Sequence, residues 1–92
     1  MNIAIITGAS SGLGREFALQ LCHNYAAEID EIWLLARRKE PLLTLAQEIS
    51  ATGICVGAAM PMDITDKEQM KDFQDKLEIE VPTVKYLINA AG

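Results

Sequence analysis

The 92-residue sequence predicts an α/β fold built on a parallel sheet, because short apolar runs alternate with longer segments of helical periodicity. This βαβαβαβ alternation implies parallel strands joined by right-handed crossovers. We therefore expect a doubly wound sheet with strand order 3-2-1-4. Its ligand crevice should lie at the carboxyl ends of the first and fourth strands, where the winding reverses. The apolar runs are residues 2–7, 32–36, 54–60 and 84–88.

The first strand and the first helix lie on either side of a glycine-rich turn. Residues 2–7 place apolar side chains at consecutive positions, which predicts a strand buried on both faces. The segment from about Gly12 to Ala27 has helical periodicity. Its apolar stripe contains Phe17, Leu21 and Tyr25, with Ala18 and Cys22 beside it.

The middle of the chain predicts a strand, a helix and a further strand. Residues 32–36 form the second strand, and Pro41 suits the first position of the helix that follows. Gly53 is typical of a helix stop. We expect the third strand over residues 54–60, weakened by Gly57. The apolar stripe of the second helix contains Leu42, Leu45, Ala46 and Ile49.

The last part of the chain predicts a third helix and a fourth strand. Thr65, with Glu68 three residues later, has the pattern of a capping box at a helix start. Val81 and Pro82 break this helix, and residues 84–88 form the fourth strand. The side chains expected to face inward from the helix are Met70, Phe73 and Leu77.

Composition and charge narrow the class of protein. Half of the residues are hydrophobic and 23% are charged, which indicates one small globular domain rather than disorder. A net charge of −5 argues against nucleic acid as a partner. No apolar run reaches the length of a membrane span and no signal peptide is evident, so we expect a cytoplasmic location without a membrane partner. Cys22 and Cys55 lie in apolar company, so we expect reduced core thiols rather than a structural disulfide.

The sequence Thr7-Gly8-Ala9-Ser10-Ser11-Gly12-Leu13-Gly14 links the first strand to the first helix. A helix N-terminus offers unpaired backbone N–H groups and the positive end of the helix dipole to an anion. Glycines allow positive φ angles and leave no Cβ between the ligand and those N–H groups. We therefore expect a phosphate or pyrophosphate at the N–H groups of Ser10 to Leu13, with Gly14 allowing close packing of the helix. The alternative is a flexible surface loop that contains three glycines.

The glycine spacing is neither G-x-G-x-x-G nor a P-loop, because Phe17 occupies the third glycine position and no Lys follows Leu13. The pattern Thr-Gly-x-x-x-Gly-x-Gly, one strand from the N-terminus, resembles the cofactor turn of the short-chain dehydrogenase/reductase family. The resemblance implies that residues 1–92 form an NAD(P)-binding Rossmann domain. It covers the whole chain but only the N-terminal, cofactor-binding half of the family's fold.

The end of the second strand indicates which dinucleotide binds. An acid usually contacts the ribose hydroxyls of NAD there, but this chain has Ala36, followed by Arg37 and Arg38. A guanidinium binds a 2′-phosphate with a fork of hydrogen bonds, so we expect NADP rather than NAD. Another basic residue common in NADP-preferring members of the family is replaced by Ser11. The alternative is a solvated cationic helix start.

Two further segments fit the cofactor site by resemblance. An Asp at the position of Asp63 accepts a hydrogen bond from the adenine amino group in the family, and the N–H of Ile64 can reach a ring nitrogen. The alternative for Asp63 is a turn-forming residue. The segment Asn89-Ala90-Ala91-Gly92 resembles the family's Asn-Ala-Gly motif, in which small residues permit close approach of the cofactor ribose.

No residue of this chain is identified as catalytic or metal-binding. The family reduces carbonyls with a Tyr, a Lys four residues later and a Ser, but Ile29 follows Tyr25 and Ala90 follows Tyr86 at that spacing. His23 is expected to be a surface or boundary residue. One His and two distant Cys do not make a metal site.

The sequence therefore predicts the NADP(H)-binding part of a short-chain oxidoreductase. The parent protein would transfer a hydride between NADP(H) and a carbonyl or alcohol substrate, while the 92-residue chain alone is expected to be inactive. The alternative is a stand-alone, non-catalytic module that binds or senses NADP(H). Because the fourth strand would be an apolar edge, we also expect self-association along it.

Overall fold

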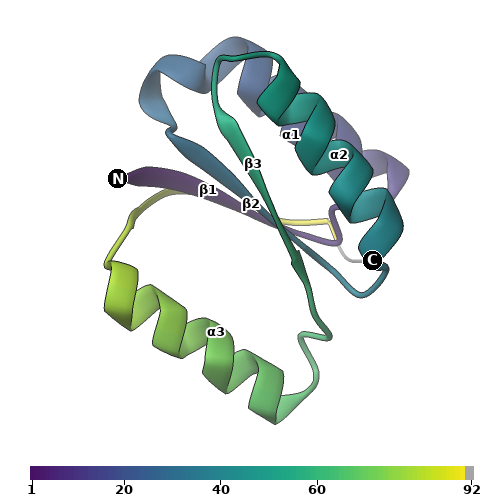
Figure 1. The fold of residues 1–92 in the computed structure, drawn as a ribbon, viewed down its shortest axis with the longest axis vertical. Helices are drawn as coiled ribbons and strands as arrows, with labels where there is room; N and C mark the ends of the chain where they lie inside the picture. Colours follow the sequence, from purple (N-terminus) through teal and green to yellow (C-terminus); the bar gives the residue numbers. More distant parts are fainter. Residues whose placement is uncertain (91–92) are drawn as a thin grey trace.

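The computed structural model describes residues 1–90 and alternates strands with helices along the whole of that range (Figure 1). Within this range the chain forms a single sheet with helices on both faces. A short 3-10 helix, η1, follows the first α-helix. The elements are β1 (Asn2–Thr7), α1 (Gly12–Tyr25), η1 (Ala26–Glu28), β2 (Glu31–Ala36), α2 (Lys39–Ala51), β3 (Val56–Pro61), α3 (Lys67–Glu80) and β4 (Thr83–Asn89).

The sheet has the order β3-β2-β1-β4, and each pair of neighbours is parallel. This confirms the predicted doubly wound topology. Ile5 at the centre of β1 lies opposite Trp33 of β2 and Leu87 of β4. The carboxyl ends of β1 and β4 are adjacent, since Thr7 pairs with Asn89. The expected switch point therefore lies beside the glycine-rich turn.

Two hydrophobic layers hold the sheet between its helices. Alternate side chains of β1 and β2, such as Ile6 and Leu34, pack with α1 and α2 on one face. Their neighbours, including Ile5 and Trp33, face α3 on the other face. Figure 1 shows α1 and α2 together on one side of the sheet and α3 alone on the opposite side. Each strand of the pair β1 and β2 is therefore buried on both faces, as the consecutive apolar residues predict.

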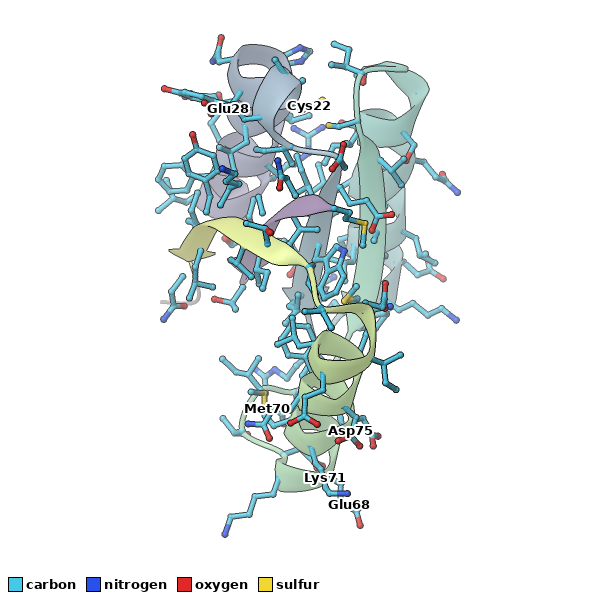
Figure 2. The ribbon with its side chains drawn as sticks, turned by 90° about the vertical axis from the view of Figure 1, so that its left-hand side faces the viewer. Cys22, Glu28, Glu68, Met70, Lys71 and Asp75 are labelled. Atoms are coloured by element: carbon cyan, nitrogen blue, oxygen red, sulfur yellow. The ribbon has the colours of Figure 1, made fainter. Side chains whose placement is uncertain are left out.

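Helix α3 covers its face of the sheet with the predicted inward side chains. Met70, Phe73 and Leu77 pack against the second layer, and the rings of Phe73 and Trp33 meet edge to face with centroids 6.0 Å apart. Figure 2 shows the charged side chains of α3, including Lys71 and Asp75, away from the sheet. No helix among residues 1–90 is long and apolar enough to cross a membrane.

The third strand begins later than expected, at Val56 instead of residue 54. Gly57 pairs in the strand with Ile32 of β2. A Cβ on Gly57 would lie 2.8 Å from the backbone of Ala46 in α2. Gly57 was expected to weaken the strand, but it also allows α2 to approach the sheet closely.

The third helix is capped by Asp66, so the predicted capping role of Thr65 is wrong. The Asp66 side chain accepts hydrogen bonds from the N–H groups of Glu68 at 2.9 Å and Gln69 at 3.2 Å. Asp is as good an N-cap as Thr, and the helix begins one residue later than the capping box implied. Pro41 is the third residue of α2, still within the first turn, where its missing N–H costs nothing.

The apolar stripe of α1 is only partly buried. Ala18, Leu21 and Cys22 face the core, whereas Phe17 is 38% exposed and Tyr25 is 48% exposed. Within residues 1–90 the sheet ends at β4, so no further strand lies beyond it to meet this side of α1.

Candidate functional site

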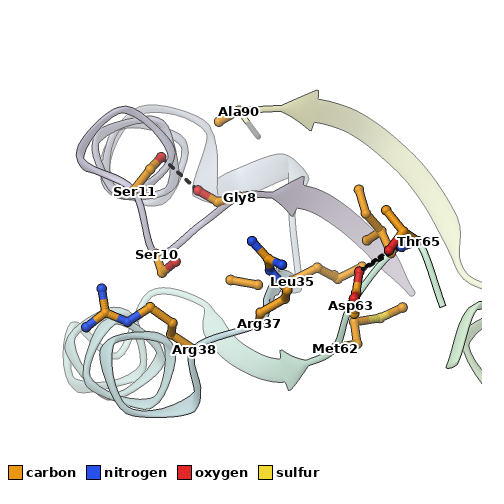
Figure 3. Close-up of a pocket in the computed structure, with 12 residues that line it drawn as sticks. Gly8, Ser10, Ser11, Leu35, Arg37, Arg38, Met62, Asp63, Thr65 and Ala90 are labelled. Atoms are coloured by element: carbon orange, nitrogen blue, oxygen red, sulfur yellow. Dashed lines mark hydrogen bonds between the residues drawn. The ribbon is translucent and has the colours of Figure 1, made fainter. Parts of the chain in front are cut away.

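A cavity of about 490 Å³ lies at the carboxyl ends of the strands, where the sequence predicts the ligand crevice (Figure 3). This volume is in the range of small-molecule sites. Its walls come from the β1–α1 turn, the β2–α2 connection, the β3–α3 connection and the end of β4. The residues that line it are Gly8, Ser10, Ser11, Leu35, Ala36, Arg37, Arg38, Met62, Asp63, Ile64, Thr65 and Ala90.

The glycine-rich turn is held in place by its own hydrogen bonds. Gly8 has a φ of 68°, a left-handed conformation that favours glycine. The Ser11 hydroxyl donates to the Gly8 carbonyl at 2.8 Å and accepts from the Gly14 N–H at 3.0 Å, so Ser11 is the N-cap of α1. The Ala9 N–H donates to the Leu35 carbonyl of β2 at 3.2 Å, which ties the turn to the sheet.

The last two glycines of the turn have different roles. A Cβ on Gly14 would lie 2.3 Å from the Gly8 carbonyl oxygen and 2.9 Å from the Ala9 Cα, so the helix packs directly on the turn backbone. A Cβ on Gly12 would meet nothing within 4 Å. Gly14 is therefore required by the fold, whereas the space beside Gly12 is open to a ligand.

The start of α1 has the features of an anion site. Gly12 and Leu13 are the first two residues of the helix, and N–H groups at such positions have no partner within a helix. The first turn contains no acidic residue that would repel an anion. The helix dipole adds a partial positive charge at the same place.

Two arginines add positive charge to the wall formed by the β2–α2 connection. Arg37 and Arg38 both line the cavity, and neither has an ion-pair partner within residues 1–90. In Figure 3 Arg37 lies between Ser10 and Asp63, while Arg38 lies over the start of α2. Arg15, by contrast, is paired with Glu48 at 2.6 Å and lies outside the cavity lining.

Asp63 is held in a turn on the opposite wall. Its Oδ1 accepts hydrogen bonds from the Thr65 hydroxyl at 2.7 Å and the Thr65 N–H at 2.9 Å. These bonds hold the pKa of Asp63 below its usual value, and the positive charge of Arg37 lowers it further. The carboxylate therefore stays ionised. Within residues 1–90 its Oδ2 has no hydrogen-bond partner, so the turn role leaves one oxygen available to a ligand.

Thr7 and Asn89 connect the two strands at the switch point. The Thr7 hydroxyl donates to the Asn89 Oδ1 at 2.7 Å, and the Ala90 N–H donates to the Thr7 carbonyl at 2.9 Å. These contacts hold Ala90 at the cavity wall. Ala91 and Gly92, the other members of the predicted motif, lie outside the described residues.

The structure brings most of the predicted binding residues to one cavity. Thr7, Gly12, Leu13, Gly14 and Asn89 lie in the turn, at the start of α1 or at the strand ends, and are not among the residues that line the cavity. Leu35, Met62 and Thr65 also line the cavity, although the sequence did not predict them as site residues. The signal for them was positional, because Leu35 lies at the carboxyl end of β2, and Met62 and Thr65 lie in the connection that follows β3.

The cavity lining offers charged and hydrogen-bonding groups that could bind a ligand. Its described lining contains no His, Cys, Tyr or Lys side chain, and the pKa of its one carboxylate is lowered. Tyr86 does not line the cavity; its hydroxyl donates to Glu28 at 2.8 Å, an interaction that raises the tyrosine pKa. Among residues 1–90, no group of three or more His, Cys, Asp or Glu could hold a metal ion.

Known proteins that match this chain are short-chain dehydrogenases and reductases. The family model described as short chain dehydrogenase matches residues 2–92. A short chain dehydrogenase of Pseudocercospora fijiensis is 38% identical over 91 residues, which are 97% of this chain and 27% of that protein. A very-long-chain 3-oxoacyl-CoA reductase of Aspergillus clavatus is 39% identical over 94 residues, covering 97% of this chain and 25% of that protein.

Solved structures match the same region. The crystal structure of a metagenomic short-chain oxidoreductase in complex with NADP superposes with a TM-score of 0.79 at 27% identity. The match covers 99% of this chain and 39% of that one. The chain thus spans about a quarter of the length of the two curated relatives described above.

Proposed function

This chain belongs to the short-chain dehydrogenase family, and we propose that it forms the NADP(H)-binding part of an oxidoreductase. The parent protein would transfer a hydride between NADP(H) and a carbonyl or alcohol substrate. The observation that carries the proposal is one cavity that combines a helix N-terminus preceded by glycine with two guanidinium groups that have no ion-pair partner within residues 1–90. A ligand with two separate anionic groups fits this arrangement.

Each part of the cavity has a proposed task toward the dinucleotide. The N–H groups between Ser10 and Leu13 would hold the pyrophosphate at the positive end of α1. Asp63 would accept from the adenine amino group through its remaining oxygen, beside the Ile64 backbone. Ala90 would permit close approach of the ribose. NADP(H), when bound, supplies or accepts the hydride, whereas the residues described here bind and orient it.

The preference for NADP over NAD rests on the end of β2. Ala36 provides no carboxylate to repel a 2′-phosphate, and Arg37 follows it at the cavity wall. The chain is also similar to an oxidoreductase that was solved in complex with NADP. We assign Arg37 as the main ligand of the 2′-phosphate and Arg38 as the secondary one.

We expect cofactor binding and catalysis to reside in different parts of the parent protein. The chain has no Tyr-x-x-x-Lys, so we expect the residues that protonate the substrate to lie in the remainder of a longer protein. The substrate pocket would be shaped by that remainder too. The cytoplasmic location remains a prediction from the sequence.

The alternative function is a stand-alone module that senses NADP(H). Tight NADPH binding by a stable monomer would favour this alternative.

Replacing Arg37 with alanine is expected to weaken NADPH binding on the order of 10- to 100-fold. The variant loses hydrogen bonds between charged groups, each worth roughly 1.5–3 kcal/mol. NADH lacks the 2′-phosphate, so its affinity should barely change. Titration of the 92-residue chain with both cofactors measures the two effects side by side.

The control for Arg37→Ala is Lys71→Ala, which also removes one positive charge. Lys71 is exposed on α3 and does not line the cavity. Lys71→Ala should leave both affinities unchanged. Arg38→Ala should give a smaller loss of NADPH affinity than Arg37→Ala. Equal losses of NADPH and NADH in Arg37→Ala would remove the 2′-phosphate assignment.

Replacing Gly12 with valine should abolish most cofactor binding while the chain stays folded. The Cβ of residue 12 meets nothing within 4 Å, so the branched side chain would occupy the open space assigned to the pyrophosphate. We expect a loss of at least tenfold for NADPH and NADH alike, since both carry the pyrophosphate. Gly12→Ala is the matched control for backbone effects and should lose less affinity. A folded Gly12→Val chain that binds NADPH as the parent does would show that the site is misplaced.

A further inference from the structure

Two cysteines from different parts of the chain meet in the core. Cys22 lies in α1 and Cys55 lies between α2 and β3, 33 residues away. Their Sγ atoms are 3.3 Å apart, with the Cys55 thiol donating to Cys22. Cys22 is fully buried and Cys55 is 6% exposed. Figure 2 shows Cys22 on the helix that packs on the upper face of the sheet.

We propose that Cys22 and Cys55 are a redox-active pair that closes into an intramolecular disulfide and locks α1 to the segment entering β3. Both thiols are free in the structure described here, which is the reduced state of the pair. The proposal concerns a site separate from the cofactor cavity and does not depend on the proposed function.

The geometry allows the bond with a small movement. A disulfide has an S–S length of about 2.05 Å, so the two sulfurs must approach by roughly 1.2 Å. Cys22 is held in a helix, but Cys55 belongs to a segment of irregular structure that follows Gly53, whose φ is 72°. The neighbouring Ile54 is 52% exposed, so this segment lies at the surface. The approach can therefore come from Cys55 without moving α1.

The chemistry balances with a small-molecule disulfide of the glutathione class as the oxidant. The Cys55 thiol loses a proton, and its thiolate attacks one sulfur of the oxidant, forming a mixed disulfide and releasing one glutathione thiolate. Cys22 then loses its proton and attacks the Sγ of Cys55, releasing the second glutathione thiolate. The two protein thiols are oxidised to one disulfide, and one glutathione disulfide is reduced to two thiols.

The surroundings of the pair slow its oxidation. Burial and the hydrogen bond to Cys22 raise the pKa of Cys55 to about 12. Little thiolate is present near neutral pH, and the thiolate is the reacting form. Oxidation therefore requires local opening of residues 53–55, which makes the pair respond slowly to a sustained change of redox conditions.

Treatment of the 92-residue chain with oxidised glutathione tests the proposal directly. After incubation, alkylation and digestion, mass spectrometry should find a peptide pair joined through Cys22 and Cys55, with a mass loss of two hydrogen atoms. The oxidised chain should also unfold at higher denaturant concentration. A cross-link that closes a loop of this length lowers the unfolding equilibrium constant by on the order of several hundred-fold. Reduction with dithiothreitol should reverse both changes.

Two single variants separate the attacking thiol from the resolving one. Cys22→Ser should stop at a mixed disulfide of Cys55 with glutathione, whereas Cys55→Ser should stay largely unmodified because Cys22 is fully buried. Thiols that remain fully alkylatable in the parent chain would overturn the proposal. The proposal would also be overturned if the unsubstituted chain formed only glutathione adducts or only disulfides between chains. If the disulfide formed but lowered the stability of the chain, the proposed stabilising link between α1 and the segment entering β3 would be wrong.

Discussion

A chain in which Gly14 is replaced by alanine should be strongly destabilised, although the change adds one methyl group. The new Cβ would lie 2.3 Å from the Gly8 carbonyl oxygen and 2.9 Å from the Ala9 Cα. Both contacts are with backbone, so no side chain can rotate away. Overpacking of this kind costs about 3 kcal/mol or more, much of the stability of a small domain. Relief of the clash would move α1 off the turn and displace the N–H groups that we propose to bind the pyrophosphate.

The matched control is Gly12→Ala, two residues earlier in the same helix. Its Cβ meets nothing within 4 Å, and alanine is a better helix former than glycine, so stability should be unchanged or slightly higher. Urea unfolding followed by circular dichroism measures both variants. If Gly14→Ala unfolds at the same midpoint as Gly12→Ala, the close packing of α1 on the turn is not a constraint on the fold.

The two glycines show how far the sequence can predict this site. The strand, turn and helix around residues 7–14 follow from periodicity and spacing alone, and so does the position of the crevice. The separate tasks of Gly12 and Gly14 do not, because they depend on which backbone atoms lie within a few ångströms. Gly57 is a similar case, since its contact partner, Ala46, lies on a different element.

Two expectations failed or were incomplete because the sequence pattern did not specify which residues would contact one another. Thr65 fits a capping box, but its hydroxyl donates to Asp63, and Asp66 caps α3 instead. Both arrangements satisfy the local sequence pattern, and the neighbouring turn decides between them. The contact between Cys22 and Cys55 could not be foreseen either, because periodicity places each residue in the core without giving its partner.

The β4 edge is expected to govern how the 92-residue chain behaves in solution. Strand β4 is the last strand of the described sheet, and only β1 pairs with it. Leu87 is 68% exposed and Val84 is 44% exposed along this edge. Unpaired backbone groups beside apolar side chains pair readily with other chains. We therefore expect a dimer joined along β4, or larger aggregates, at low micromolar concentration.

The same chain should show no dehydrogenase turnover, because it has no Tyr-x-x-x-Lys to protonate a carbonyl. Cofactor binding is expected to be weak if residues beyond β4 complete the crevice wall. Assays with NADPH and a panel of ketones measure the first point, and sedimentation velocity measures the association. Turnover by the purified chain would show that a catalytic group has been overlooked among its residues.

A charged substitution on β4 distinguishes pairing along this strand from nonspecific association. Leu87→Lys puts an ammonium group on the open strand and should shift the chain to a monomer without unfolding it, since the wild-type side chain is already mostly exposed. Leu43→Lys makes the same change on α2, where Leu43 is 38% exposed, and should leave association unchanged. Equal association of both variants would place the contact elsewhere. A parent chain that sediments as a stable monomer and binds NADPH tightly would instead favour a self-sufficient sensing module, because its β4 edge would then need no partner.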